Sequence, residues 1–267
     1  MKRVSIYNSY VKDNPKKRET IEQELRKHGF QTTKKGEFVI IIGGDGTFLS
    51  GVKKKIEKDP VFVVMNAGNL GFYSEFHVDD IEKVIEVIKN KDYYIEEHPM
   101  YEVHFHGKNG VHVEYFINEV VVTEAEDLAI HMVLEVDGQV LFRVPADNMI
   151  ISGMGGSTGY NVNAGGPISF CPNVYNIAIT NPIMNKAFPY RVYPAVIPND
   201  SELKVYPSTL KQRSYKVVCD SREIKDIEYK YITIKKHEKP IKILRTNGYS
   251  RINHIHERLL NFSSPKN

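Results

Sequence analysis

The sequence predicts an α/β N-terminal domain with a parallel sheet, followed by a mainly β C-terminal domain. Short apolar runs alternate with helix-like segments in the first part of the chain, and closely spaced strand-like runs follow from about residue 100. The 267 residues are enough for one large or two modest domains, and an apolar content of 41% supports ordinary hydrophobic cores. We therefore expect domains at residues 1–98 and 99–250 and a separate C-terminal segment at 251–267.

The N-terminal strands are predicted from continuous, β-branched apolar runs, which are typical of strands buried on both faces. These runs occupy residues 3–8, 38–43 and 61–66. Amphipathic spacing predicts helices between and after them, on the evidence of Ile21 with Leu25, and of Ile81, Val84, Ile85 and Ile88. This alternation predicts a parallel sheet that binds its ligand at the carboxyl ends of the strands.

The C-terminal strands are predicted from shorter runs separated by turn residues. They cover residues 101–106, 111–123, 130–136, 139–143, 176–180, 190–197, 215–219 and 227–235. Asp137-Gly138 predicts a hairpin turn between residues 136 and 139. A short terminal helix is predicted by Ile252, Ile255, Leu259 and Leu260.

The strand at residues 38–42 runs directly into Gly43-Gly44-Asp45-Gly46-Thr47. The glycines permit close backbone approaches, Thr47 can cap or open the following helix, and amides at a helix start attract phosphate oxygens. Asp45 is then well placed to accept a proton from a hydroxyl that attacks a phosphoryl group, or to hold a metal ion. The simpler alternative is a strand-to-helix turn whose aspartate only caps amides.

Two familiar phosphate-binding loops are excluded at this position. The Walker pattern requires a lysine directly after its last glycine, whereas Val52 follows Gly51. The dinucleotide fingerprint fails because Leu49 stands at its third glycine position. A different kind of phosphate-handling turn is therefore indicated.

A second candidate segment is glycine-rich, with four glycines among residues 153–159, followed by Tyr160. Backbone amides and hydroxyls of such a loop can surround a flat polar base, and Tyr160 offers a stacking face. This pattern suits a dinucleotide. The alternative is a plain glycine-rich loop with Tyr160 in the core.

These segments together resemble the bacterial-type NAD kinases. The GGDGT run at 43–47 is shared with diacylglycerol kinases, with sphingoid kinases and, more distantly, with phosphofructokinases. Three further stretches narrow the choice: N-A-G-N-L-G-F at 66–72, Asn118-Glu119, and S-T-G-Y with A-G-G-P at 157–167. Four motifs in the family's order identify the chain as a member of that family.

The resemblance implies a β-sandwich-like C-terminal domain that binds the dinucleotide, and a terminal helix that packs back on the first domain. It implies that Asp45 is the proton acceptor, that Asn118 and Glu119 hold the adenosine, and that Asp147 contacts the far nucleoside. The expected substrate- and nucleotide-binding residues are Gly43, Gly44, Gly46, Thr47, Phe48, Asn66, Leu70, Gly71, Phe72, Asn118, Glu119, Asp147, Ser157, Thr158, Gly159, Tyr160, Asn163, Pro182 and Asp220.

The implied reaction is phosphorylation of the adenosine 2'-hydroxyl of NAD to give NADP. ATP or polyphosphate would donate the phosphoryl group, and Mg²⁺ or another divalent cation would accompany ATP without a dedicated protein metal site. The family also implies a homodimer or homotetramer.

The glycine-rich loop departs from the family pattern. Where relatives show S-T-P-T-G-S-T-A-Y, residues 152–160 read S-G-M-G-G-S-T-G-Y. Gly159 replaces an alanine, Asn163 replaces a serine, and Asp220 is followed by a serine rather than glycine or histidine. A more flexible loop loses more entropy on binding. Asp45 is untouched by these changes.

Three other functions fit parts of the sequence. A lipid-hydroxyl kinase shares GGDGT but should need an apolar cavity, and a non-catalytic dinucleotide-binding regulator is suggested by the altered loop. A serine hydrolase is suggested by G-x-S-x-G around Ser157, with Asp200, Asp220 or Asp226 and then His237. That hydrolase pattern needs a helix after the serine, and residues 161–167 form a poor helix.

Composition indicates a protein that binds neither nucleic acid nor membranes. The net charge is only +3, no run of about 18 apolar residues occurs, and the N-terminus has no signal-peptide core. Cys171 and Cys219 are too few for a disulfide framework, so a cytoplasmic location is expected. The histidine pairs 104/106 and 254/256 lack a third metal ligand at a recognisable spacing.

Overall fold

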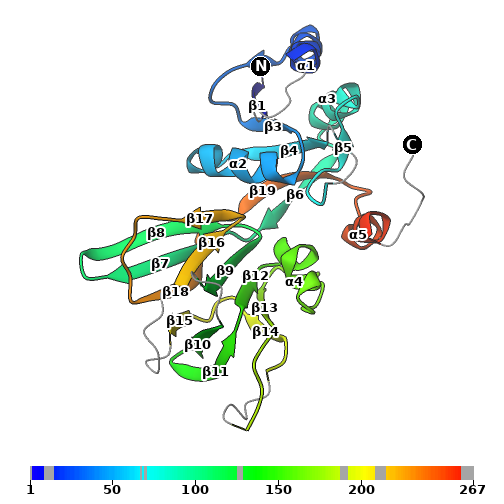
Figure 1. Ribbon diagram of the computed structural model, residues 1–267. Helices are drawn as coiled ribbons and strands as arrows, with labels where there is room; N and C mark the ends of the chain where they lie inside the picture. The colour runs from blue at the N-terminus through cyan, green and yellow to red at the C-terminus, as the bar shows by residue number, and fades with distance from the viewer. Residues whose placement is uncertain are drawn as a thin grey trace. The chain divides into compact units, whose positions relative to one another are not determined.

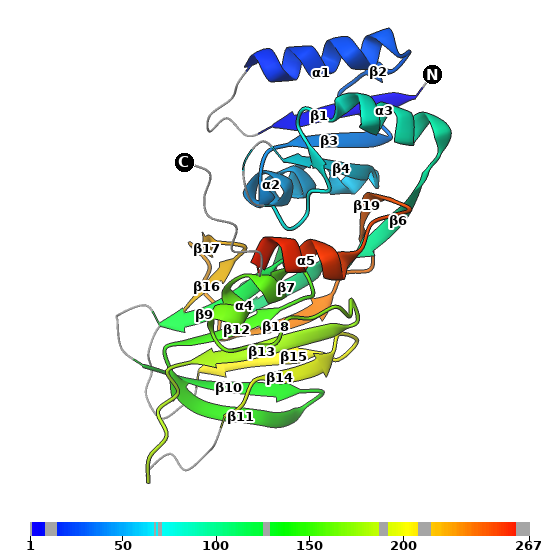
Figure 2. The ribbon, with the colours of Figure 1, turned by 90° about the vertical axis from the view of Figure 1, so that its right-hand side faces the viewer.

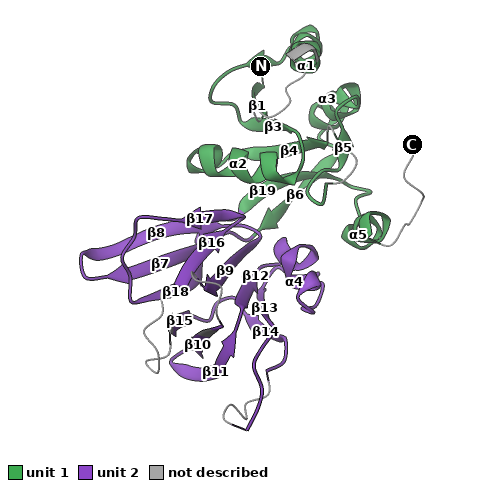
Figure 3. Ribbon diagram, in the orientation of Figure 1, with its two compact units in different colours: residues 1–98, 241–267 green, residues 99–240 purple. Residues whose placement is uncertain are grey.

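A computed structural model of the chain describes residues 2–8, 15–66, 68, 71–124, 129–186, 192–207 and 215–259 (Figure 1). The chain forms two compact units: unit 1 comprises residues 1–98 and 241–267, and unit 2 comprises residues 99–240 (Figure 3). Unit 1 is α/β with parallel strands and unit 2 is built from antiparallel sheets, so the predicted fold class is confirmed.

Unit 1 is built on one sheet with the strand order β2-β1-β3-β4-β19-β6, and β5 also pairs with β4. Its paired strands run parallel except β19 and β6, which are antiparallel. The strands are β1 (Arg3–Asn8), β2 (Gln31–Thr32), β3 (Phe38–Ile42), β4 (Val61–Asn66), β5 (Phe76–His77), β6 (Tyr93–His98) and β19 (Ile241–Thr246).

Helices α1, α2 and α3 of unit 1 flank strands β1, β3 and β4, and α5 lies apart from them (Figure 2). They are α1 (Pro15–Lys27), α2 (Asp45–Lys55), α3 (Ile81–Asn90) and α5 (Arg251–Leu259), with a 3-10 turn η1 (Ile56–Lys58) after α2. Leu25 of α1 and Val84 of α3 share a buried cluster with Ile40 of β3. Helix α2 covers the opposite face, where a Cβ on Gly51 would crowd Ile41 and Tyr7. Apolar residues on both faces explain the continuous apolar strands of the sequence.

Strand β19 corrects the predicted boundary at residue 250. We expected residues 241–250 in the β-rich half, but Ile243 pairs with Phe62 of β4 and with Glu96 of β6. Ile241 and Ile243 are fully buried in unit 1. The chain thus returns to the first unit at residue 241, before helix α5 begins.

Unit 2 contains two antiparallel sheets, each of six strands within the described residues. One has the order β11-β10-β15-β18-β7-β8, from β7 (Tyr101–Gly107), β8 (Gly110–Phe116), β10 (Ile130–Val136), β11 (Gln139–Ala146), β15 (Leu203–Pro207) and β18 (Tyr231–Lys236). The other has the order β14-β13-β12-β9-β16-β17, from β9 (Glu119–Glu124), β12 (Asn148–Ser152), β13 (Val174–Thr180), β14 (Ala195–Pro198), β16 (Tyr215–Cys219) and β17 (Arg222–Ile224). Phe105 of the first and Ile177 of the second belong to one buried cluster, which makes unit 2 a β-sandwich.

Several predicted strands differ from the observed ones. The run at 111–123 is two strands, β8 and β9, separated at residues 117–118. The run at 227–235 becomes a strand only from Tyr231. Part of the run at 190–197 lies outside the described residues, and the strand observed there is β14.

The hairpin at 136–139 is confirmed. Val136 pairs with Gln139, and the two turn residues Asp137 and Gly138 have φ angles of 49° and 79°. Positive φ at both central residues is what a two-residue hairpin turn requires. Among the described helices, none combines the length and the apolar character needed to cross a membrane.

Candidate functional site

The GGDGT segment forms the turn from β3 into α2. Gly43 has φ 148°, and a Cβ there would collide with the side chain of Thr47. Gly44 is the N-cap residue, so α2 begins at Asp45 itself. Thr47 therefore does not cap or open the helix as predicted; it lies in the first turn, where its amide donates to the Gly44 carbonyl at 3.0 Å.

The Asp45 carboxylate is held by two backbone amides. Phe72 N–H donates to both carboxylate oxygens, at 3.1 and 3.0 Å, and Tyr73 N–H donates to Oδ1 at 3.2 Å. Burial raises the pKa of Asp45, whereas these two amides and the positive charge of Arg258 oppose the rise. A carboxylate with a raised pKa, fixed at a strand end, has the properties of a general base.

The segment that supplies the two amides is tightly packed. A Cβ on Gly71 would lie 2.6 Å from Ser74 Oγ, so any larger residue at that position would force the buried Ser74 side chain to move. The Gly71 carbonyl accepts hydrogen bonds from His254 Nε2 at 3.2 Å and Arg258 Nε at 3.0 Å. Nearby, the buried Asn66 accepts from the Gly68 amide at 2.9 Å. Leu70, another predicted site residue, lies outside the described residues.

Phe48, another predicted site residue, packs inside unit 1. Its side chain is fully buried and stacks on Tyr73, with ring centroids 4.4 Å apart. Its amide bonds the Gly44 carbonyl inside α2. Phe48 therefore supports the Asp45 region through core packing.

In unit 2, Asp220 binds the backbone of residues 117–119 from the distant turn between β16 and β17. Its carboxylate accepts hydrogen bonds from the Ile117 amide at 3.0 and 3.1 Å and from the Asn118 amide at 2.8 Å. The Asp220 amide in turn donates to the Glu119 carbonyl at 3.0 Å. Asp220 and Ser221 both have positive φ in the tight turn between β16 and β17. These bonds hold residues 117 and 118 out of regular strand pairing, which explains the interruption between β8 and β9.

The glycine-rich loop packs directly on Asn118 and Glu119. The Gly153 amide donates to the Asn118 carbonyl at 3.1 Å, and a Cβ on Gly156 would collide with that same carbonyl. A Cβ on Gly159 would lie 3.6 Å from Glu119 Oε2. The loop continues as a 3-10 turn, η2 (Gly156–Thr158), and a short helix, α4 (Tyr160–Asn163). Within unit 2, the structure thus brings together Asn118-Glu119, the glycine-rich loop and Asp220.

Within this loop, exposure separates structural residues from residues that a ligand could reach. Ser157 and Thr158 are buried, and Ser157 Oγ donates to the Met154 carbonyl at 2.8 Å. Tyr160 is 40% exposed and its hydroxyl accepts from Asn148 Nδ2 at 3.2 Å, so the alternative of a core tyrosine is wrong. Asn163 is also exposed and donates to the Gly159 carbonyl at 3.1 Å.

The serine hydrolase alternative fails on these contacts. The hydroxyl of Ser157 is buried against backbone carbonyls. The candidate base His237 bonds Glu102 through Nδ1 at 2.7 Å, and the candidate acid Asp220 holds backbone amides. The described residues therefore contain no Ser-His-Asp relay at Ser157.

Asp147 and Pro182 lie at strand ends elsewhere in unit 2. Asp147 is exposed; its Oδ2 accepts from Asn181 Nδ2 at 2.6 Å and its amide donates to the Thr180 carbonyl at 3.2 Å. Pro182 follows Asn181, which has a positive φ of 47°. A side-chain hydrogen bond between Asn148 and Tyr160 connects this region with the glycine-rich loop.

Sequence reasoning missed Asn161, Arg258 and His254. Asn161 is fully buried and its Nδ2 donates to the Pro167 carbonyl at 2.8 Å, which ties the start of α4 to the A-G-G-P segment. Its position between the S-T-G-Y and A-G-G-P stretches could have indicated that Asn161 belongs to the site. Arg258 and His254 sit on an ordinary amphipathic helix far along the chain, and no motif marks them.

Glu119, in the same cluster, has a strongly shifted pKa. Burial, and then the negative charge of Asp220, raise the pKa of Glu119 to about 7. We expect Asp220→Asn to lower that pKa, because the nearby charge is removed while one side-chain oxygen remains to accept the amide bonds. A pH titration of the Glu119 carboxyl by ¹³C NMR measures the shift.

The sign of the associated stability change follows from this raised pKa. The folded state favours protonated Glu119, so its contribution to stability is present below the unfolded pKa of about 4.3 and is lost as the pH rises toward 7. Asp220→Asn should reduce this loss across that window. An unchanged Glu119 titration in the variant would show that Asp220 does not act on it.

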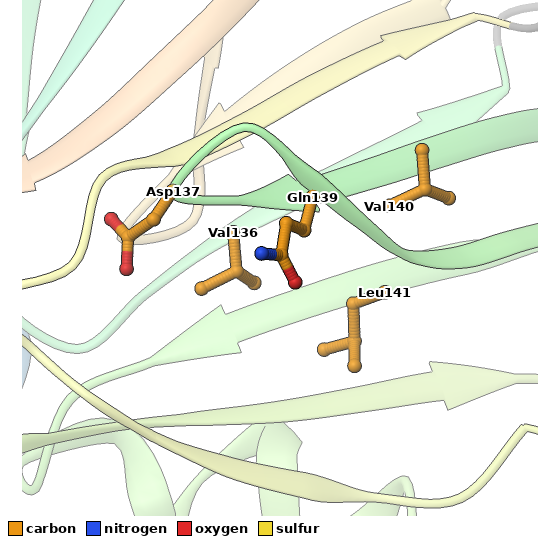
Figure 4. Close-up of a pocket in the computed structure, with 5 residues that line it drawn as sticks. All are labelled: Val136, Asp137, Gln139, Val140 and Leu141. Carbon is orange, nitrogen blue, oxygen red and sulfur yellow. The ribbon is translucent and has the colours of Figure 1, made fainter.

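Other clusters do not compete with these sites. The hollow at the β10–β11 hairpin is lined by residues of that hairpin alone, namely Val136, Asp137, Gln139, Val140 and Leu141 (Figure 4). Its carboxylate is already engaged, since Asp137 Oδ1 accepts from the Glu202 amide at 2.9 Å. The described residues also contain no group of three or more histidine, cysteine or carboxylate side chains arranged to hold a metal ion.

Comparisons with known proteins agree with this arrangement. Residues 5–93 match the model of the ATP-NAD kinase N-terminal domain, and residues 117–246 match that of the ATP-NAD kinase C-terminal domain. The NAD kinase of Finegoldia magna is 31% identical over 211 residues, which cover 75% of this chain and 77% of the relative. The NAD kinase of Wigglesworthia glossinidia brevipalpis is 31% identical over 236 residues, covering 86% and 77%.

Solved structures show the same fold. A yeast NADH kinase complexed with NADH superposes with a TM-score of 0.84 at 18% identity, covering 99% of this chain and 89% of the yeast chain. An NAD kinase from Archaeoglobus fulgidus in complex with ATP gives a TM-score of 0.75 at 21% identity, covering 96% and 98%. With both family domains matched in order along the sequence, this chain belongs to the NAD kinase family.

Proposed function

We propose that this chain transfers a phosphoryl group from ATP to the 2'-hydroxyl of the adenosine ribose of NAD, and so produces NADP. Membership of the family supports the reaction. The observation that carries the mechanism is the geometry of Asp45, whose carboxylate is fixed by the Phe72 and Tyr73 amides at the end of a parallel strand. In open α/β sheets, ligands bind at the carboxyl ends of the strands.

Asp45 acts as the general base in this proposal. The 2'-oxygen attacks the γ-phosphorus of ATP, the bond from that phosphorus to the β–γ bridging oxygen breaks, and ADP leaves. The proton of the 2'-hydroxyl passes to the Asp45 carboxylate. Because burial raises the pKa of Asp45, the carboxylate is a better proton acceptor than an ordinary aspartate.

The cluster in unit 2 is proposed to bind the dinucleotide. Exposed Tyr160 offers a stacking face, and Asn118 and Glu119 offer polar groups beside the glycine-rich loop. The Asp220 carboxylate fixes the backbone of this cluster, so the changed residue after it does not remove its structural role. Asp147, at its own strand end, is proposed to contact the other nucleoside.

The divalent cation is proposed to enter with ATP as part of the substrate. Mg²⁺ usually keeps several waters and is bound largely through substrate phosphates. Bound there, Mg²⁺ would neutralise charge on the phosphates during transfer.

Homo-oligomerisation as a dimer or tetramer is proposed from the family, and a cytoplasmic location from the composition and the low cysteine count. Sedimentation of the purified chain would test the first, and fractionation of cells would test the second.

The deciding experiment measures NADP formation by the purified chain, with ATP and with inorganic polyphosphate as donors in parallel. We expect NADP with ATP, and the second arm decides whether polyphosphate also serves. A diacylglycerol arm with labelled ATP separates a lipid-hydroxyl kinase from an NAD kinase. Binding of NAD without turnover under either donor would instead favour a non-catalytic dinucleotide-binding protein.

A further inference from the structure

The carboxylate of Asp45 is connected to helix α5 through a single peptide group. The Gly71 carbonyl and the Phe72 N–H belong to the same peptide unit. The N–H donates to both oxygens of Asp45, at 3.1 and 3.0 Å. The carbonyl accepts from His254 Nε2 at 3.2 Å and from Arg258 Nε at 3.0 Å. Two donors on α5 therefore act on the peptide that holds Asp45.

The protonation states support this direction of bonding. A carbonyl only accepts, so His254 Nε2 must carry the hydrogen. Burial, followed by the positive charges of Arg258 and Arg245, lowers the pKa of His254 to about 4. The hydrogen bond to Gly71 and the charge of Glu257 oppose this shift, and the ring is neutral at neutral pH. Arg258 carries a full positive charge.

Hydrogen bonds in series polarise one another. Donors on the Gly71 carbonyl make the Phe72 N–H a stronger donor to Asp45, and they also fix the plane of the peptide. The next part of the loop is fixed as well, because the buried Arg245 donates through Nη1 to the Tyr73 carbonyl at 2.9 Å. The acceptor atoms of Asp45 are therefore oriented by groups from the C-terminal part of unit 1.

We propose that Arg258 and His254 are positioning residues that orient the Asp45 carboxylate for phosphoryl transfer through the Gly71–Phe72 peptide. This inference rests on the proposed function, because it assigns the two residues to the same proton transfer. Helix α5 would then help to position the catalytic carboxylate in addition to packing in unit 1.

The test is a double-mutant cycle between Arg258→Gln and Asp45→Asn, read as NADP formation. We expect Arg258→Gln to lower kcat by about 10- to 100-fold, the scale of a small misplacement of a reacting group, with the KM for NAD changed less than about twofold. In the Asp45→Asn background the same substitution should cause little further loss. A general structural defect would instead lower activity equally in both backgrounds.

A pH profile separates charge from geometry. Asp45 must be ionised to accept a proton, so activity falls as the pH drops through its pKa. Arg258 is the charged side chain that acts on Asp45, and it lowers this pKa. Arg258→Gln should therefore move the acidic limb of kcat to higher pH. Arg258→Lys keeps the charge, so that limb should stay near the wild-type position, and this variant also serves if the glutamine variant fails to fold.

His254 is tested with a matched pair on the same helix. His254→Leu removes the donor to Gly71 and should lower kcat, whereas His254→Gln restores an N–H donor and should recover part of it. His256→Gln, at an exposed position of α5, should leave activity unchanged. Unchanged kcat and an unchanged acidic limb in Arg258→Gln and His254→Leu would overturn the inference.

Failure of the proposed function looks different. In that case the wild-type chain forms no NADP, or Asp45→Asn is fully active. An active wild type and an inactive Asp45→Asn, combined with fully active Arg258 and His254 variants, would reject only the positioning role.

Discussion

Replacing Asp45 with asparagine is expected to lower kcat for NADP formation by about 10²- to 10⁴-fold, the usual contribution of a general base. Asparagine keeps the shape of the side chain and one oxygen that can accept from the Phe72 and Tyr73 amides. It cannot take up the proton of the 2'-hydroxyl. Because none of the unit 2 residues proposed to bind NAD is altered, the KM for NAD should change only a few-fold.

Steady-state kinetics with varied NAD at saturating ATP measure both constants. Asp79→Asn is a suitable control, since that side chain is 71% exposed and the substitution also removes one carboxylate from unit 1. Full activity of Asp45→Asn would remove Asp45 from the mechanism. A large rise in KM at constant kcat would assign it to substrate binding instead.

The largest expected loss of stability comes from Arg245→Met. The Arg245 side chain is 1% exposed, and its Nε donates to Glu96 Oε2 at 2.6 Å. Its guanidinium also lies 4.2 Å from the centre of the Tyr249 ring. Removing one member of a buried ion pair leaves the other charge without compensation, which costs about 3–5 kcal/mol. Urea unfolding of the variant and the parent measures this difference.

A surface pair provides the control for this prediction. Arg222 also bonds a glutamate, Glu114, but its side chain is 49% exposed. Arg222→Gln should therefore cost no more than about 1 kcal/mol. If Glu96→Gln combined with Arg245→Met is no more stable than Arg245→Met alone, the unpaired Glu96 charge is not the source of the loss.

The pH dependence of stability checks the same pair independently. Burial alone would raise the pKa of Glu96, but His98 and Arg245 outweigh it and hold that pKa well below its usual value. A carboxyl with a lowered folded pKa contributes stability above its unfolded pKa of about 4.3 and loses it as the pH falls further. Arg245→Met should reduce this acid-side loss, since less stability depends on an ionised Glu96.

The parts of the fold that the sequence predicted well are those set by local pattern. The spacing of Ile81, Val84 and Ile88 specifies one apolar face, and helix α3 buries it. Asp137-Gly138 supplies two residues that adopt positive φ, and the hairpin forms there. The turn after β3 was likewise predicted correctly, because a continuous apolar run followed by glycines is typical of a buried strand that ends in a tight turn.

The parts that were missed depend on contacts between distant segments. The local sequence at 241–246 predicts a strand but not the sheet that the strand joins. That choice depends on the free edges of β4 and β6, which pair with these residues. The stacking of Phe48 on Tyr73 likewise joins residues 25 positions apart, and no local pattern marks it. Arg258 and His254 are recognised only when the carbonyl of Gly71 is seen between them and Asp45.

The place of β19 in the first sheet also determines the order in which the protein can be completed during synthesis. Strands β1 to β6 leave the ribosome early, yet β4 and β6 are joined only by a strand that emerges after all of unit 2. Until then the nascent sheet has an open edge, the kind of surface on which chains associate wrongly. Unit 1 is consequently completed only after unit 2 has been synthesised, and the Asp45 region then receives the α5 side chains that contact Gly71.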